Sequence, residues 1–579
     1  MSEVKVARRW RIADQQADPA AALSQALGIS PLVAHLLVRR GCTTPEAAKA
    51  FLDVPLAALH DPRLMDGMAV AVERLQRAVS RREPILICGD YDVDGVTGMA
   101  VLVTGLTRAG AEVAYAVPNR LEHGYGLPAS IVDEAATRGV RVLVTVDHGI
   151  SAHAEVNLAR DRGLDVIICD HHLPPPILPP ALAILNPRQS GCPYPFKELC
   201  GVGIAFKLLQ AFYGAEAGDE CWPLLDLVAL GTVADLVPLV GENRILVKHG
   251  LDHLAVTTRP GLRALAEVAG VPLSGPGGVT PARIAFGLAP RINAAGRMDD
   301  ATAAVRLMLT TDPFEARELA ARLDQQNRER QELEGRILEE ALAQVAASSD
   351  LARDRAVVLA SPSWHPGVLG IVASRLVERF GRPAALIGTQ GDQARGSVRA
   401  AGGWHVAEAL SRCSDLLTHY GGHRSAGGFS LAPDRIEAFR TRFLSLAAAE
   451  LTDEALAPVL EIDAEVALED LDLDLADVLS RLGPHGLGNS EPILAVRELH
   501  VMRFARRVGR NHLKIKVRQS ASGGRVVEAI GFNLGSYAEL LDRPTPPRVD
   551  LAFVPERNSW NGREMLQLRV KDLRLLEDV

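Results

Sequence analysis

Four clusters of aspartate and histidine are the part of this 579-residue sequence best suited to chemistry. The first, Asp170-His171-His172, comes directly after the short apolar run 166–169. Aspartate and histidine are rarely buried unless they are paired or bound to something, so three of them at the end of a buried strand are unusual. A polar loop tip with two chance histidines would explain this triplet if it stood alone, but two more clusters share its setting and a fourth run carries a further aspartate.

Two of the other clusters also follow apolar runs. The run 84–88 leads into the motif GDYDVDG at 89–95, and the run 141–146 leads into DHG at 147–149. Near-continuous β-branched runs that are separated by helical segments predict the strands of a parallel α/β sheet. Sites in such sheets lie beyond the carboxyl ends of the strands. The three clusters are therefore expected to form one ring of ligands at that edge.

Asp235 completes the ring, because it is a carboxylate within the apolar run 225–238. A buried carboxylate needs a cation or a hydrogen-bond donor. Carboxylates dominate the combined set and no cysteine pairs with its histidines, which favours Mn²⁺ or Mg²⁺. The predicted metal ligands are Asp92, Asp94, Asp147, His171 and Asp235. Asp90 and His172 are expected to lie in contact with the ions or just behind these ligands.

Taken together, the motifs resemble those of a known family. DYDVDG, VDHG, DHH and GTVADLVPL look like the four motifs of the DHH phosphoesterases, and later segments resemble the RecJ single-strand-specific exonucleases in particular. These later segments are APRINAAGRM (289–298), WHPGVLGIVASRL (364–376), GSVRA (396–400) and GGHRSAGGF (421–429). His148 departs from the resemblance, since Asn is more usual there; a histidine could add a metal contact or change which ion is preferred.

The pattern and the resemblance together predict an α/β protein with two α/β lobes, DHH and DHHA1, joined by a long helix and followed by an OB-like β barrel. The helix is expected to start at Asp312-Pro313, a good cap and first position, and its middle, 324–336, is polar nearly all round, as in a helix that bridges domains through solvent. The expected parts are an N-terminal helical collar packed on the catalytic domain (1–80), the DHH metal-binding catalytic domain (81–240), a helical extension (241–310), the connecting helix (311–350), the DHHA1 substrate-binding domain (351–452) and the OB-fold domain (453–579).

The resemblance implies a two-metal exonuclease that releases 5′-mononucleotides from the 5′ end of single-stranded DNA. Its catalytic residues would be Asp90, Asp92, Asp147 and His172, with His172 orienting the water or the scissile phosphate. Its phosphate contacts would be Arg120, Arg297, Ser397, Arg399 and His423, the last three holding the terminal 5′-phosphate. From the residues alone, each of these stretches is explained as well by a surface turn or a helix end.

Net charge speaks against a nucleic-acid partner, because the chain carries −8 at pH 7. A local basic patch answers this objection. The segment 501–518 holds seven Lys or Arg residues and no acid, and its last part, 512–518, alternates as a strand does. The alternation places Lys514, Lys516 and Arg518 on one face, which we expect to contact single-stranded DNA as OB-fold faces do.

Composition and cysteine usage predict the setting. Seven cysteines without a C-x-x-C pair favour a reducing cytoplasm, and neither the N-terminal segment nor the apolar window 222–240 has the character of a signal peptide or a membrane span. The expected protein is a cytoplasmic monomer of DNA recombination and repair, supplied with strands by a single-strand-binding protein and a helicase. Two alternatives stay open: a DHH hydrolase of short oligonucleotides or cyclic dinucleotides, and a non-catalytic DNA-binding scaffold.

Overall fold

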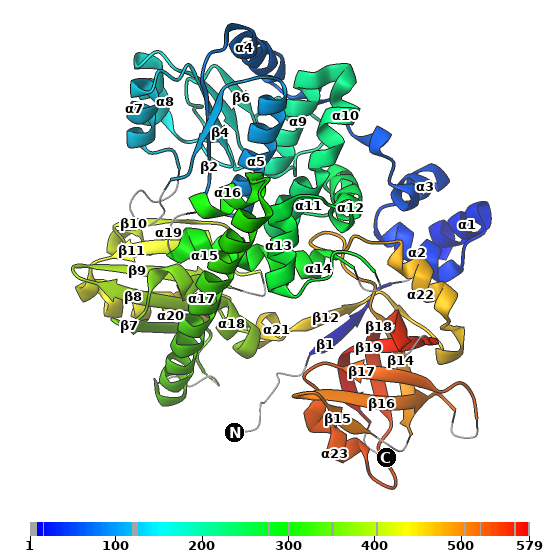
Figure 1. The fold of residues 1–579 in the computed structure, drawn as a ribbon. Helices are drawn as coiled ribbons and strands as arrows, with labels where there is room; N and C mark the ends of the chain where they lie inside the picture. The colour runs from blue at the N-terminus through cyan, green and yellow to red at the C-terminus, as the bar shows by residue number, and fades with distance from the viewer. Residues whose placement is uncertain are drawn as a thin grey trace. The chain divides into compact units, whose positions relative to one another are not determined.

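The computed structural model describes residues 8–14, 17–118, 126–275, 278–298, 301–348, 353–400, 403–502, 505–520, 523–560 and 563–576. The chain divides into two compact units. The larger unit consists of Asp14–Asn327 and Asp463–Val579, and the smaller unit consists of Met1–Ala13 and Arg328–Ile462. The long helix α17 (Pro313–Ser348) contributes to both units (Figure 1).

A five-stranded parallel sheet organises the first half of the larger unit, as the apolar runs predicted. Its order is β3 (Val113–Ala116), β2 (Ile85–Gly89), β4 (Val142–Val146), β5 (Asp165–Cys169) and β6 (Ala183–Leu185). Side chains of β2 alternate between two separate hydrophobic clusters, one on each face. This burial on both faces is why the strands read as continuous apolar runs. Gly89 pairs with Val146 and Val146 with Cys169, so β2, β4 and β5 end at the same level.

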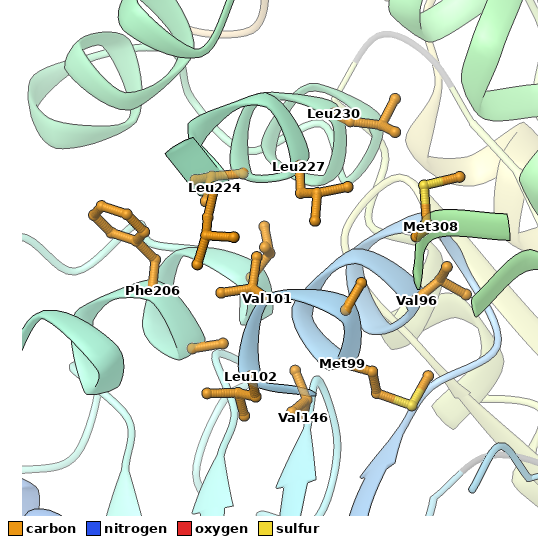
Figure 2. Packing of buried hydrophobic residues seen from close by; sticks show 14 of the residues in the cluster. Val96, Met99, Val101, Leu102, Val146, Phe206, Leu224, Leu227, Leu230 and Met308 are labelled. Atoms are coloured by element: carbon orange, nitrogen blue, oxygen red, sulfur yellow. The ribbon is translucent and has the colours of Figure 1, made fainter. Parts of the chain in front are cut away.

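Helix α5 (Val93–Arg108) lies at the centre of the larger core. It packs against β2 and β3 on one side and against α9 (Gly201–Tyr213) and α11 (Leu225–Ala234) on the other. Figure 2 shows Val96, Met99 and Leu102 of α5 in the same cluster as Phe206 of α9, Leu227 and Leu230 of α11, Val146 and Met308. The other helices of this region are α4 (Met68–Arg81), α7 (Ala129–Thr137), α8 (His153–Asp161), α10 (Ala217–Cys221), α12 (Gly241–Ala255), α13 (Pro260–Ala269), α14 (Pro281–Arg283), α15 (Ala289–Met298) and α16 (Thr302–Leu309).

The smaller unit contains a mixed five-stranded sheet with the order β10 (His419–Gly422), β11 (Ala426–Leu431), β9 (Gln393–Arg399), β8 (Ala384–Gln390) and β7 (Val357–Ser361). Only β7 and β8 pair in parallel among these neighbours. Its helices are α18 (Leu369–Phe380), α19 (Val406–Ser411), α20 (Ile436–Glu450) and α21 (Asp453–Leu456). The first strand of the chain, β1 (Arg9–Ile12), pairs in parallel with β12 (Val459–Ile462) and so joins this unit.

The C-terminal part of the larger unit is a closed sheet. Its strands are β13 (Ala464–Glu465), β14 (Leu494–Val501), β15 (Arg506–Val508), β16 (His512–Arg518), β17 (Val527–Gly531), β18 (Val549–Trp560) and β19 (Arg563–Leu575). The order runs β14-β18-β19-β17-β16, and β14 also pairs with β16. This second pairing closes a five-stranded barrel, in agreement with the predicted OB-like domain. Two short helices, α22 (Leu473–Ser480) and α23 (Ala538–Leu541), accompany it.

The N-terminal helices differ from the expected collar. Helices α1 (Ala17–Leu27), α2 (Pro31–Arg39) and α3 (Pro45–Asp53) share one hydrophobic cluster with the barrel strands, although the expectation packed them on the catalytic domain. Their apolar stripe predicted a buried face but carried no information about its partner. Within the same predicted segment, Met65 and α4 belong to the core around the parallel sheet, and α3 also contacts α12, where Arg244 Nη1 donates to the Phe51 carbonyl at 2.6 Å.

The connecting helix has nearly its predicted length, but its polar middle does not run through solvent. Asp324 accepts a hydrogen bond from Arg291 at 2.8 Å, within the larger unit. In the smaller unit Glu334 pairs with Arg330 at 3.0 Å and also with Arg375. Asp324, Arg330 and Glu334 are nearly buried. The polar side chains in the middle of this helix therefore contact other parts of the protein, and are not all directed into solvent.

No single described helix is long and apolar enough to cross a membrane; one bent pair, Asp18–Leu27 with Pro31–Arg39, meets that test by length and composition with a bend of 119°. All seven cysteines are buried and free.

Candidate metal centre

The ends of three parallel strands bring the predicted residues together. Asp90 follows β2, Asp147 follows β4, and Asp170 and the two histidines follow β5. Asp235 arrives from another direction, at the C-terminal end of helix α11. Because the three strands end at the same level, their terminal side chains meet at one edge of the sheet.

The start of α5 fixes two of the carboxylates. Asp92 is the N-cap residue and accepts hydrogen bonds from the backbone N–H groups of Asp94 (3.0 Å) and Gly95 (3.2 Å). Asp94 points instead to the first turn of α9, where it accepts from the N–H groups of Gly201 (2.6 Å) and Val202 (2.8 Å). The positive end of the α9 dipole therefore lies against a buried carboxylate.

The distances around His171 describe the centre. Its Nε2 lies 3.1 Å from Asp147 Oδ1, 3.6 Å from Asp235 Oδ2 and 3.9 Å from Asp94 Oδ2. Three groups each place their ligand atoms within 4.8 Å of one another: Asp90, Asp92 and Asp147; Asp147, His171 and His172; and Asp94, Cys200 and Asp235. Asp147 belongs to two of these groups, as a residue shared by two neighbouring cation positions would.

The electrostatics of the centre call for a cation. Burial, and then the neighbouring carboxylates, raise the pKa of Asp94 and of Asp147 well above the usual range of a carboxyl group. The same causes raise the pKa of Asp235 to about 7. Asp235 Oδ2 is buried, and no hydrogen-bond donor in the described part of the chain reaches it. A crowded set of carboxylates with one imidazole fits Mn²⁺ or Mg²⁺ by its ligand chemistry.

Asp170 supports the site from behind rather than joining a metal group. Its Oδ1 lies 2.8 Å from His172 Nδ1, and its Oδ2 accepts from the Ile150 N–H at 2.9 Å. Burial lowers the pKa of His172, but the hydrogen bond and charge of Asp170 outweigh burial, so the pKa of His172 is raised overall. Asp170 thereby fixes the orientation of the His172 ring, a role that the sequence reading did not assign to it.

The approach of α9 is the feature that sequence reading missed. The packing of this helix against the centre is tight at Gly201. A Cβ there would lie 2.8 Å from the Asp147 Cβ and 2.9 Å from Asp94 Oδ2, so glycine lets the helix end reach the carboxylates. Cys200 also enters the group of Asp94 and Asp235. The one signal in the sequence was a cluster of small residues before a helix.

His148 does not belong to any of the metal groups found among the described residues. Its side chain is fully buried, and burial lowers its pKa to about 4. A neutral ring packed beside β2 explains this histidine without a metal contact.

Comparison with known proteins identifies the chain. Models of three domains match it: the DHH family N-terminal domain over residues 84–232, the DHHA1 domain over 353–449 and the RecJ OB domain over 462–572. The single-stranded-DNA-specific exonuclease RecJ of Bacillus subtilis is 41% identical over 574 residues, which cover 98% of this chain and 71% of that protein. This chain belongs to the RecJ family.

Solved structures agree with this assignment and confirm the predicted fold. RecJ from Thermus thermophilus in complex with Mn²⁺ has a TM-score of 0.83 and 34% identity, and covers 99% of this chain and 80% of that one. The same protein in complex with Mg²⁺ has a TM-score of 0.75 and 32% identity, with coverages of 98% and 79%.

Helix α15, which carries the RecJ-like segment 289–298, lies against the metal-binding loop. Asn293 Oδ1 accepts the backbone N–H of Val93 at 3.2 Å, and a Cβ at Gly296 would lie 2.7 Å from the Tyr91 carbonyl oxygen. The small residues of this segment therefore let the helix approach the loop. The next residue, Arg297, stays a predicted phosphate contact, and Arg120 lies outside the described residues.

In the DHHA1 domain the strand register brings the predicted phosphate pocket together. Ser397 and Arg399 lie on one face of β9, and Arg399 Nη1 donates to Ser397 Oγ at 3.0 Å. Arg399 pairs with Ala426 of β11, whose carbonyl accepts the His423 N–H at 2.8 Å. Gly370, near the start of α18, faces both side chains, since its Cβ would lie 2.6 Å from the Arg399 guanidinium and 3.0 Å from Ser397 Oγ.

The basic strand β16 of the RecJ OB domain alternates as predicted, but an acidic side chain lies beside its basic residues. Leu513, Ile515 and Val517 are buried in the barrel, which puts the basic residues of β16 on the other face. However, Lys514 Nζ forms an ion pair with Glu528 of β17 at 2.8 Å. Glu528 belongs to the neighbouring strand, so the sequence of β16 alone could not predict this ion pair.

Proposed function

We propose that this chain is a metal-dependent exonuclease that degrades single-stranded DNA from its 5′ end and releases 5′-mononucleotides in DNA recombination and repair. The proposal rests on one observation: all the predicted metal ligands converge around Asp147 in a chain of the RecJ family. Relatives in this family are named single-stranded-DNA-specific exonucleases, and the Thermus thermophilus structures contain Mn²⁺ or Mg²⁺.

Two such ions would be held by Asp92, Asp94, Asp147, His171 and Asp235, with Asp90 alongside. Bound ions would supply an activated water and a positive charge to stabilise the leaving oxygen of the cleaved phosphodiester. The protein keeps the carboxylates in place through the α5 cap and the N–H groups of α9. His172, fixed at Nδ1 by Asp170, presents its Nε2 edge to the water or the scissile phosphate.

The other phosphates of the strand would be bound by Arg120 and Arg297, and the 5′-terminal phosphate by Ser397, Arg399 and His423. Lys516 and Arg518 of the barrel, with a smaller share from Lys514, would bind the strand farther along. We also propose a cytoplasmic monomer that receives strands through a single-strand-binding protein and a repair helicase. The seven buried, free cysteines support a reducing compartment.

Neither rival activity is favoured by a specific observation. A non-catalytic scaffold has no need for buried carboxylates whose pKa values are raised. A hydrolase of dinucleotides or cyclic dinucleotides has no need for a barrel with a basic strand.

The deciding experiment is digestion of DNA labelled at the 5′ or the 3′ end, single- or double-stranded, with Mn²⁺, Mg²⁺ or EDTA. We expect a 5′ label to appear at once as mononucleotide from single strands, and EDTA to stop the reaction. A 3′ label should stay in progressively shorter strands. Mononucleotide release from the 3′ label first, equal rates on duplex DNA, or activity only on dinucleotides would contradict the proposal.

A further inference from the structure

A surface groove in the larger unit has no part in the proposed exonuclease. It has a volume of about 660 Å³, and its walls are the turn between α1 and α2 (28–33) and the segment 466–478 that leads into α22. Both walls rest on the hydrophobic cluster that α1 and α2 share with the barrel. The groove is therefore part of one packed body, and its volume is in the usual range of binding clefts.

The floor and the rim of the groove differ in chemistry. The floor is apolar and partly exposed, and consists of Ile29, Leu32, Val466, Leu475 and Val478. The rim carries three exposed carboxylates, Asp470, Asp472 and Asp474, and no Lys, Arg or His is among the described lining residues. Asp472 is held in place because it caps α22, accepting the Leu475 N–H at 2.7 Å.

The three rim carboxylates are not neutralised by the protein. Within the described ranges, none of them forms an ion pair with a lysine or arginine. Their neighbour Asp477, outside the lining, does pair with Arg557, which shows how this region neutralises an acid that it does not present. A negatively charged rim around an apolar floor is stabilised by a ligand that has positive charges beside an apolar surface.

From this complementarity we infer that the groove is a docking site for a short basic, amphipathic segment of a partner protein. Apolar side chains of that segment would displace water from the floor, and Lys or Arg side chains would pair with the rim. Nucleic acid is excluded as the occupant because its phosphates would meet three carboxylates. The inference does not depend on the exonuclease activity, since no lining residue belongs to the metal centre.

The test uses the full chain and a fluorescein-labelled 12-residue peptide with alternating leucine and arginine, followed by fluorescence anisotropy. The decisive variant is Asp470→Asn with Asp472→Asn and Asp474→Asn, which removes the charges but keeps the shape, and Asn still caps a helix well. We expect binding to weaken about tenfold, the effect of roughly half a kcal/mol from each of three exposed pairs. A peptide with glutamate in place of arginine should not bind.

The matched control neutralises three exposed acids elsewhere in the same unit, through Glu46→Gln, Asp53→Asn and Glu539→Gln. This variant should bind the peptide as the unmodified chain does. Equal loss in both variants would mean attraction by net charge alone and would overturn the proposal. Undiminished peptide binding in the rim variant would also overturn the proposal. So would a rim variant that binds the peptide normally but differs from the unmodified chain in oligomeric state.

To map the contact, Asp470→Cys can carry a benzophenone cross-linker, because all seven native cysteines are buried and react slowly. We expect the peptide to be cross-linked from position 470 but not from a Glu539→Cys control. Cross-linking of equal strength from both positions would place the peptide outside the groove.

Discussion

Asp147 combines two features that a residue serving only the fold would not need. Its backbone is left-handed, with φ of 65°, and its carboxylate is buried beside other carboxylates. Left-handed backbone costs energy for most residues and is tolerated best by Gly, Asn and Asp. The side chain lies 3.1 Å from His171 Nε2, so this energetic cost falls where the predicted metal ligands meet.

We predict that Asp147→Asn abolishes hydrolysis while the protein stays folded. Asn tolerates the left-handed backbone and has nearly the same shape, but it removes the charge that two cation positions share. The rate should fall by more than about 100-fold, and the Tm of the metal-free protein should not decrease, because a buried charge is lost. Calorimetric titration with Mn²⁺ should show weaker binding. Near-normal turnover with unchanged Mn²⁺ dependence would contradict the assignment of Asp147 to the metals.

The raised pKa values predict an unusual pH dependence of stability. Asp235 titrates near 7 in the folded protein but near 3.9 when unfolded, so between these values the folded state binds more protons than the unfolded state. The metal-free protein should therefore lose stability as pH rises from about 4 through 7, with Asp94 and Asp147 acting in the same direction.

Mn²⁺ must displace these protons, so its affinity should rise by up to tenfold per pH unit for each proton displaced. Thermal unfolding at pH 6 and pH 8, with and without Mn²⁺, measures both effects. The increase in Tm caused by Mn²⁺ should be larger at pH 8, and Asp235→Asn should reduce the difference. An increase in Tm that is the same at both pH values would show that the carboxylates are already ionised without metal.

At the scale of elements, helix α15 explains why the segment 289–298 matters beyond its arginines. The helix touches the loop that carries Asp90, Asp92 and Asp94 through Asn293 and Gly296, and Arg291 ties it to α17 through Asp324. These contacts place α15 between the connecting helix and the metal loop. It is suited to hold that loop in position.

We predict that Gly296→Ala lowers kcat and Mn²⁺ affinity by at least about tenfold with little change in Tm. The new Cβ would meet the Tyr91 carbonyl oxygen at 2.7 Å, and backbone cannot move aside without shifting the metal loop. Small displacements of catalytic groups are costly, on the order of 100-fold for about 1 Å. The control is Gly335→Ala on α17, which has no atom within 4 Å and should stabilise the helix slightly. Unchanged kinetics in the Gly296 variant would mean that α15 does not position the loop.

Strand β9 sets the second element-scale prediction. Arg399→Ala should reduce the preference for a 5′-phosphate much more than it reduces the chemical step, because Arg399 lies with Ser397 and His423 and not among the metal ligands. The measurement compares rates on 5′-phosphorylated and 5′-hydroxyl strands. Arg395→Ala, four residues earlier on the same face of β9, is the control. If the Arg399 variant keeps the original ratio, the terminal phosphate binds elsewhere.

The sequence predicted the strands and helices better than it predicted which of them pack against one another. Apolar runs ending in Asp or His predicted β2, β4, β5 and their meeting point, because strand ends in a parallel sheet are fixed by local pattern. The N–H groups of α9 that bind Asp94 were missed, since a helix end has no side-chain signature of its ligand. The pairing of β1 with β12 was also missed, because it joins segments about 450 residues apart. Periodicity shows that a face is buried, but not what covers it.

At the scale of the whole molecule, the question is how a chain of net charge −8 holds a polyanion. The basic face of β16 is the candidate, although Glu528 of β17 already pairs with Lys514. Lys516 is exposed on the same strand, two residues farther along. Glu528 is the register partner of Lys516, but its carboxylate forms the ion pair with Lys514. A DNA phosphate would therefore have to displace a paired carboxylate at Lys514, and this difference between the two lysines can be measured.

We predict that Lys516→Gln reduces the salt dependence of binding to a long single strand, while Lys514→Gln has a smaller effect. Each phosphate neutralised by a cationic side chain contributes a slope of ~0.7 to the dependence of log affinity on log salt for single strands. The Lys516 variant should therefore lower the slope by about 0.7. Lys514 must leave Glu528 to bind a phosphate, so its net contribution is less.

Cleavage of a dinucleotide, which needs only the metal centre and the phosphate pocket, should be unchanged in both variants. Binding titrations at several salt concentrations in metal-free buffer give the slope of log affinity against log salt for each protein. Equal slopes for both variants and the unmodified chain would exclude β16 as the DNA-binding strand. The acidic net charge would then again count against DNA binding.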